Sequence, residues 1–225
     1  MMRRLVLLAA LVLCLSAAAE VHYKPHISIG GRAGVSMAQM SFSPSVKQSF
    51  NMGSTGAVTF RYTEEKLFGF IAELGWVQRG WKENYEELPF EYSRSITYLN
   101  LPLLTHIYFG SPRFKCFINL GPQVALYLGD KISSNFDYEH PGTVQGYPAN
   151  RQTAQLSMDI TGKFDYGICG GLGFEFYVSP RNSIFVEGRY YYGLGNIYPS
   201  SKADTFGASR NMSIEATIGY NFRLK

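Results

Sequence analysis

Apolar and polar residues alternate with a period of two over most of the chain. In residues 27–37 one phase carries Ile27, Ile29 and Val35, and the other carries polar and small residues such as Ser28 and Arg32. This period is typical of a β-strand whose two faces meet different surroundings. The pattern returns seven more times, at residues 52–63, 68–82, 95–109, 113–128, 163–178, 183–195 and 211–224. It predicts an all-β fold of eight strands.

The predicted strands are long, and the connections between them alternate in length. Soluble sheets use strands of roughly five or six residues, whereas a tilted strand needs roughly 9 to 11 residues to cross a bilayer. Short connections alternate with long ones, as in transmembrane barrels with short periplasmic turns and longer outer loops. We therefore expect an eight-stranded antiparallel up-and-down transmembrane β-barrel with both termini on the periplasmic side. The short connections are 64–67, 110–112 and 179–182, and the long ones are 38–51, 83–94, 129–162 and 196–210.

The composition of the two phases predicts which one faces outward. A soluble barrel would carry Lys and Glu on its outer face, but the polar phase is rich in glycine and has few charges per strand. Glycine fits a lumen too narrow for side chains from every strand. The other phase is apolar and aromatic, as a lipid-facing surface requires. The predicted lipid-facing aromatic residues are Phe70, Trp76, Phe174, Phe176, Tyr190, Tyr192, Tyr220 and Phe222.

Charged residues of both signs share the phase that is predicted to face inward. Side chains just fill the interior of an eight-stranded barrel, and buried charges need partners. We expect an ion-pair network that blocks free passage through the lumen. The alternative is a gated or selective pore. The expected members of the network are Arg32, Arg61, Glu73, Arg79, Glu175, Glu187, Arg189 and Glu215.

Residues 1–19 have the pattern of a secretory signal peptide. Arg3 and Arg4 precede an apolar run at residues 5–15, and Ala17 and Ala19 fit a small-residue cleavage site. The apolar run is too short for a membrane-spanning helix, which needs about 20 residues. The barrel domain is then expected at 20–225. Its basic and acidic residues nearly balance and form no basic stripe, so no nucleic-acid partner is expected.

Cysteine and histidine residues give no pattern of an active site or metal centre. Cys116 shares the outward phase and Cys169 the inward one, so we expect two free thiols. No Cys or His pair has the spacing of zinc ligands, and His106 lacks a nearby nucleophile and acid. The glycines of residues 170–173 lie in a strand pattern, which does not fit a nucleotide-binding loop. We predict a non-enzymatic protein with no catalytic residue, no metal and no cofactor.

Several strand segments resemble the PorT-like outer-membrane β-barrel family of Bacteroidetes. The resemblance lies in residues 30–36 (GGRAGVS), 72–80 (AELGWVQRG), 95–104 (SITYLNLPLL) and the pair Gly121-Pro122. It implies an eight-stranded barrel in a bacterial outer membrane. Most members have no assigned activity, and one takes part in a protein secretion system. The family supplies no catalytic residue for this chain.

These observations favour an integral outer-membrane barrel whose outer loops contact a surface ligand or an envelope partner. The long segment 129–162, with Phe136, Tyr138 and Tyr147, is the expected contact region, although it could equally be a mobile cap. The alternatives are an accessory subunit of a secretion or transport complex, a narrow porin and a lipid-modifying barrel enzyme. Outer-membrane lipid is the expected partner of the barrel wall.

Overall fold

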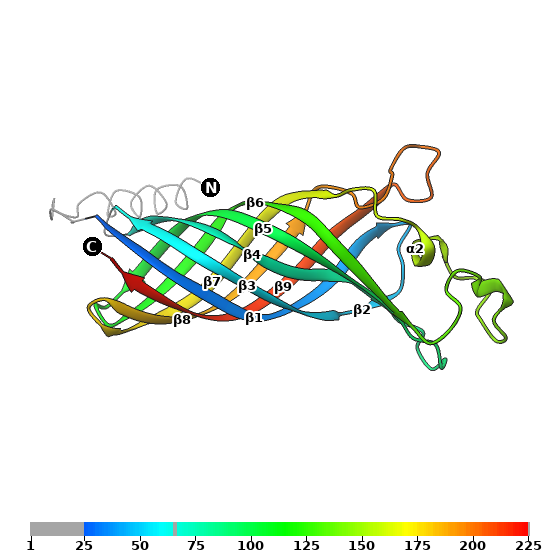
Figure 1. Cartoon of the computed structure of the whole chain (residues 1–225), viewed down its shortest axis with the longest axis horizontal. Helices are drawn as coiled ribbons and strands as arrows, with labels where there is room; N and C mark the ends of the chain where they lie inside the picture. The colour runs from blue at the N-terminus through cyan, green and yellow to red at the C-terminus, as the bar shows by residue number, and fades with distance from the viewer. Residues whose placement is uncertain (1–24, 65–66, 225) are drawn as a thin grey trace, which may run out of the picture.

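The computed structural model describes residues 25–64 and 67–224, which form one antiparallel β-sheet closed into a barrel (Figure 1). The expected signal peptide, residues 1–19, lies outside the described residues. Strand neighbours follow the order β2-β4-β3-β1-β9-β8-β7-β6-β5, and a further pairing of β4 with β5 closes the ring. The strands are β1 His26–Ser43, β2 Gln48–Ser49, β3 Asn51–Thr63, β4 Phe68–Glu83, β5 Tyr92–Gly110, β6 Phe114–Ser134, β7 Phe164–Ser179, β8 Asn182–Gly193 and β9 Ala208–Arg223.

The two ends of the barrel differ, and the predicted all-β up-and-down barrel is confirmed. Short connections join β3 to β4, β5 to β6 and β7 to β8 at one end, where β1 also starts and β9 ends. The longer connections all lie at the opposite end (Figure 1). The longest of them carries a short 3-10 helix, η1 Pro141–Thr143, and a one-turn helix, α2 Ala154–Ser157. Within the described residues, no helix is long and apolar enough to span a bilayer.

The predicted strand ends are wrong at the loop end of the barrel. β1 continues to Ser43 and pairs there with Ala208 of β9, although residues 38–51 were expected to form a loop. β6 likewise continues to Ser134, well past the expected end at residue 128. In both extensions the outward residues become polar while the strand pairing continues. The alternation of an apolar outer face therefore ends before the strands do.

The outer surface has an apolar band and, beyond it, a polar collar. Outward residues of β1 are apolar up to Met37 and polar from Gln39 onward, and those of β4 become polar at Gln78. Because hydrocarbon tolerates only the apolar part, the strands extend beyond the bilayer on the loop side. Seven of the eight predicted lipid-facing aromatic residues are 39–53% exposed on this surface: Phe70, Trp76, Phe174, Phe176, Tyr190, Tyr220 and Phe222. Tyr192 differs, because it is only partly exposed and its hydroxyl lies 3.5 Å from Arg210 Nη1.

Candidate functional site

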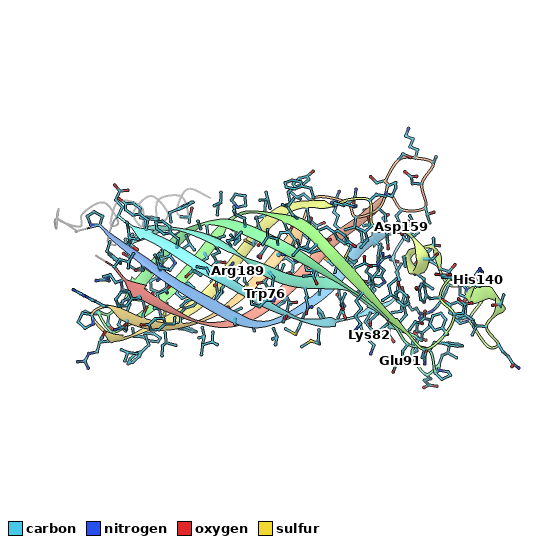
Figure 2. The ribbon with its side chains drawn as sticks, in the orientation of Figure 1. Trp76, Lys82, Glu91, His140, Asp159 and Arg189 are labelled. Atoms are coloured by element: carbon cyan, nitrogen blue, oxygen red, sulfur yellow. The ribbon has the colours of Figure 1, made fainter. Side chains whose placement is uncertain are left out.

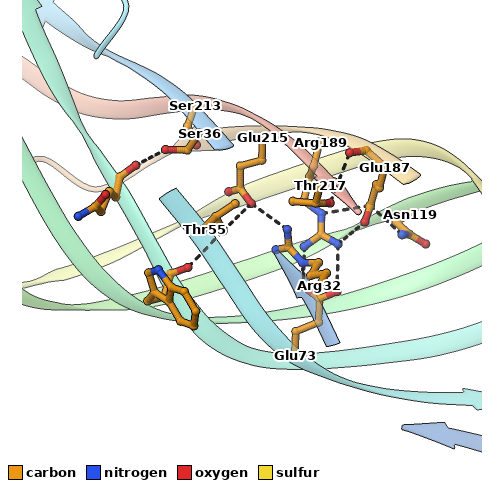
Figure 3. A network of polar contacts seen from close by, with 12 residues as sticks. Arg32, Ser36, Thr55, Glu73, Asn119, Glu187, Arg189, Ser213, Glu215 and Thr217 are labelled. Carbon is orange, nitrogen blue, oxygen red and sulfur yellow. Dashed lines mark hydrogen bonds and ion pairs between the residues drawn. The ribbon is translucent and has the colours of Figure 1, made fainter. Parts of the chain in front are cut away.

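Five buried charged residues form a continuous network across the middle of the lumen (Figure 3). Arg32 donates from Nε to Glu73 Oε2 over 3.0 Å and from Nη1 to Glu215 Oε2 over 3.1 Å. Arg189 donates from Nη1 to Glu73 Oε2 over 2.7 Å and from Nη2 to Glu187 Oε2 over 2.9 Å. Glu73, on β4, therefore joins two guanidinium groups that come from β1 and β8.

Two further ion pairs lie on either side of this network. Near the turn end, Arg61 Nη1 donates to Glu175 Oε2 over 2.8 Å, and Ser183 Oγ donates to Glu175 Oε1 over 2.6 Å. Nearer the loop end, Arg79 Nη1 donates to Asp165 Oδ2 over 3.3 Å. All eight charged residues expected in the lumen are buried there, and Asp165 joins them.

Uncharged polar residues complete these contacts, and sequence reasoning did not single them out. Asn119 Nδ2 donates to Glu187 Oε1 over 2.8 Å, and Asn221 Nδ2 donates to Glu175 Oε1 over 3.3 Å. Both asparagines stand on the inward phase of their strands. That phase was the signal that could have identified them, because a buried amide there must find a hydrogen-bond partner.

Glycines on the inward phase leave room for the network. A Cβ atom at Gly171 would lie 2.4 Å from Glu187 Oε1, and one at Gly173 would lie 2.2 Å from Phe117 Cζ. Both distances are far below van der Waals contact, so no larger residue fits without moving the lumen side chains. At these two positions the lumen side chains as placed leave no room for a methyl group.

His106 is a packed residue of the lumen. It is 1% exposed, its Nδ1 lies 2.7 Å from Asn119 Oδ1, and its ring centroid lies 5.2 Å from those of Tyr108 and Phe117. Among the described residues, its side-chain hydrogen-bond partner is Asn119, which donates in turn to Glu187. Cys169 is a buried free thiol on the lumen side and Cys116 a partly exposed free thiol on another strand, so neither extends the site.

Above the lumen, aromatic residues close the loop end of the barrel. Trp81 packs edge-on against Phe42 with ring centroids 5.4 Å apart, and Phe206 packs against Phe42 at 5.1 Å. Tyr198 lies 5.9 Å from Phe206 and donates from its hydroxyl to the Gln155 carbonyl over 3.1 Å. These contacts join two strands to loops that are far apart in the sequence.

We use the name canopy for the four loop connections, residues 44–50, 84–91, 135–163 and 194–207, which pack together above this aromatic layer (Figure 2). Phe136 lies 5.7 Å from Tyr85 and 5.4 Å from Phe90, measured between ring centroids. The Tyr147 hydroxyl lies 3.4 Å from that of Tyr85, and burial raises the pKa of Tyr147. Phe136 and Tyr147, two aromatic residues of the expected contact segment 129–162, thus pack the loops together.

The canopy encloses a polar cavity of about 410 Å³ with charges of both signs. Lys47 Nζ lies 2.7 Å from Glu86 Oε1, and this hydrogen bond holds the pKa of the Glu86 carboxyl below its usual range. Arg151 lies with Cζ 4.4 Å from the Tyr85 ring centroid and with Nη1 3.7 Å from Glu83 Oε2. These side chains come from three separate loops and the end of β4, so the cavity exists only when the canopy is assembled.

Across residues 25–64 and 67–224, no group of three His, Cys, Asp or Glu side chains is arranged to hold a metal ion.

The closed antiparallel ring, the apolar outer band and the charged interior together define an integral β-barrel of an outer membrane. The model of the outer membrane protein beta-barrel domain matches residues 24–198, which is most of the chain. The chain belongs to this family. Its wall is embedded in the lipid of the outer membrane.

Solved structures of small outer-membrane barrels are similar to the chain over most of their length. OprG of Pseudomonas aeruginosa is 15% identical with a TM-score of 0.46, covering 89% of this chain and 95% of its own. Outer Membrane Protein W of E. coli is 16% identical with a TM-score of 0.44, covering 90% and 100%. Ail of Yersinia pestis is 12% identical with a TM-score of 0.42, covering 88% and 99%. No curated protein matches the chain by sequence.

Proposed function

We propose that the protein is a closed, non-enzymatic outer-membrane barrel that acts through its canopy at the cell surface. The observation that carries this proposal is the combination of a filled lumen with loops that are packed around a polar cavity. Buried ion pairs leave little free path for solutes, so the barrel wall acts as an anchor. The canopy cavity, with Lys47, Glu83 and Arg151, suits a polar ligand or partner that carries charge.

The proposal includes an orientation in the membrane. The canopy would face outward and both termini would lie in the periplasm, because long loops of such barrels face the outside. Residues 1–19 would act as the signal peptide that directs residues 20–225 to the envelope. We also infer that the chain is PorT-like, on the strength of segments 72–80 and 95–104.

Conductance in planar bilayers tests the closed lumen. The wild-type barrel should give no steady channel, whereas Arg189→Ala should give measurable conductance, because the guanidinium fills the centre of the network. Lys202→Gln, in the loop between β8 and β9, serves as the control and should stay closed. A steady wild-type conductance would show that the protein is a narrow porin.

A binding array tests the canopy as the functional surface. Purified protein in neutral detergent would be applied to an array of charged and neutral oligosaccharides. We expect wild-type binding to one or more charged members, and loss of that binding in Lys47→Gln/Arg151→Gln. Trypsin cleavage on intact cells should reach the canopy, which checks that it faces outward. Absence of wild-type binding, or unchanged binding by the double variant, contradicts the proposal.

A further inference from the structure

Two turns of similar sequence stand side by side at the end of the barrel opposite the canopy. Residues 111–113 and 179–181 both read Ser-Pro-Arg, and the hairpins that carry them are adjacent because β6 pairs with β7. Tyr177 N donates to the Arg113 carbonyl over 2.9 Å, and Arg223 N donates over 2.8 Å to the carbonyl of the second turn's arginine. These bonds join the turns and the end of β9 into one rim.

A cavity of about 720 Å³ opens at this rim, and three of its lining residues are basic. Its basic residues come from two distant parts of the chain: the first turn with the start of β6, and the end of β9. Its other wall is aromatic and aliphatic. We call it the basic mouth, and its residues used below are Arg113, Lys115, Phe176, Tyr177, Val178 and Arg223.

The three cations of the basic mouth are within ion-pair distance of no carboxylate among the described residues. Within the described part of the chain, Arg113, Lys115 and Arg223 make no ion pair. Arg223 Nε is buried without a hydrogen-bond partner there. Glu175, two residues from Tyr177, is already bound to Arg61.

Aromatic rings hold two of these cations in place. Lys115 Nζ lies 4.3 Å from the Tyr108 ring centroid and 4.9 Å from that of Tyr177, and Arg223 Cζ lies 5.9 Å from the Tyr177 centroid. Ring faces attract cations but do not accept the full set of their hydrogen bonds. The mouth therefore presents positioned donors whose natural complement is an anion with several acceptor oxygens.

We propose that the basic mouth binds the phosphate of an anionic phospholipid headgroup. Arginine and lysine together bind phosphate oxygens through charge-assisted hydrogen bonds, and basic pockets at a membrane surface select anionic headgroups. Two lining residues extend the pocket to the lipid: Phe176 is 52% exposed and Val178 is 62% exposed on the outer surface of the barrel. A headgroup in the mouth can thus keep its acyl chains in the bilayer.

Equilibrium binding of short-chain lipids to the full chain in neutral detergent tests this inference. The probes are dihexanoyl phosphatidylglycerol, dihexanoyl phosphatidylcholine, whose choline cancels the phosphate charge, and inorganic phosphate. We expect phosphatidylglycerol to bind about tenfold or more tightly than the other two. Arg113→Gln/Arg223→Gln should lose this preference, and so should Lys115→Gln, while Lys202→Gln at the opposite end should keep it.

Heat-modifiable migration on gels would show that each variant still forms a closed barrel. Equal affinity for the two lipids would mean that the headgroup charge is not recognised, and the proposal would fall. Inorganic phosphate binding as tightly as phosphatidylglycerol would overturn the lipid assignment, since the pocket would then take a free anion. Retention of the preference by the folded double variant would place the lipid site elsewhere.

Discussion

Charged residues in the lumen are compatible with a stable barrel only when they are paired with other residues. An unpaired charge in a barrel interior keeps its full desolvation penalty, whereas a paired and hydrogen-bonded one regains most of it. Arg61 and Glu175 form the simplest case, because they meet each other near the turn end and are separate from the central network around Arg32. This pair therefore allows the cost of an unpaired buried charge to be measured.

We predict that Arg61→Met destabilises the folded barrel by about 3–5 kcal/mol, because it leaves Glu175 charged and buried. The double variant Arg61→Met/Glu175→Gln should recover most of that loss, since Ser183 and Asn221 can still bind the amide oxygen. Urea unfolding in lipid vesicles measures both. Lys47→Met, in an exposed ion pair, is the control and should change little. A double variant that is no more stable than Arg61→Met would refute the pairing.

The exposed pair of Lys47 and Glu86 should make one canopy contact sensitive to acid. The lowered pKa of Glu86 means that the contact contributes stability above the ordinary value of 4.5, and loses it as pH falls through the lowered value. Asn84 N donates to the Lys47 carbonyl over 3.0 Å, so its hydrogen exchange reports this contact. We expect its protection to fall with acid in the wild type but not in Glu86→Gln. The same acid response in both proteins would contradict this.

At the residue scale, the sequence predicts which charges face inward but not which of them meet. The phase of each strand places Arg79 and Asp165 in the lumen. Their contact joins β4 to β7, which are not neighbours in the sheet, and so depends on strand tilt and stagger. A period of two carries no information on that stagger.

At the scale of elements, the period of two predicts the strands correctly within the apolar band. Beyond the band, the predicted strand ends are wrong. In the extension of β1, Met40 and Phe42 point inward while Gln39 and Ser41 point outward. The alternation therefore persists with its faces reversed, apolar inside and polar outside. Because the lipid-facing pattern stops at this point, the sequence predicts a loop where β1 in fact continues.

The canopy depends on contacts that no local pattern reveals. Phe206, fully buried, links the connection 194–207 to Phe42 of β1 across most of the chain length. Its partners are set by where the barrel places the loops, so its role could not be predicted from the sequence around it. For the same reason, the sequence around Tyr147 does not reveal that its ring packs against Tyr85 and Phe90.

We predict that Phe206→Ala opens the connection 194–207 without opening the barrel. Loss of a buried aromatic side chain costs about 3–5 kcal/mol of local packing, which increases the open population. Trypsin cleavage after Lys202 should become about tenfold faster or more, because proteolysis follows that population. Thr205→Ala, at an exposed neighbour, should leave the rate unchanged. Equal rates for the two variants would show that Phe206 does not hold the loop.

At the scale of the whole molecule, the barrel has an interior with the polarity of a protein surface and an exterior with that of a core. This reversal fixes the barrel in a membrane. The polar collar, which begins at Gln39 on β1 and at Gln78 on β4, marks where the membrane ends. The overall architecture was predictable because every strand repeats the same reversal. Ligand and partner identity was not, since those depend on loops that meet only in the folded protein.

The two tryptophans of the chain lie on opposite faces of β4, Trp76 in the apolar band and Trp81 inside the barrel beyond that band, so together they report how the wall sits in the membrane. Trp76 is 48% exposed on the outer surface, and Trp81 is fully buried inside. Single-tryptophan variants, Trp81→Phe and Trp76→Phe, would be folded into vesicles with and without bromine on the lipid chains. We predict strong quenching of Trp76 fluorescence by brominated lipid and little quenching of Trp81. Strong quenching of Trp81 with none of Trp76 would contradict it.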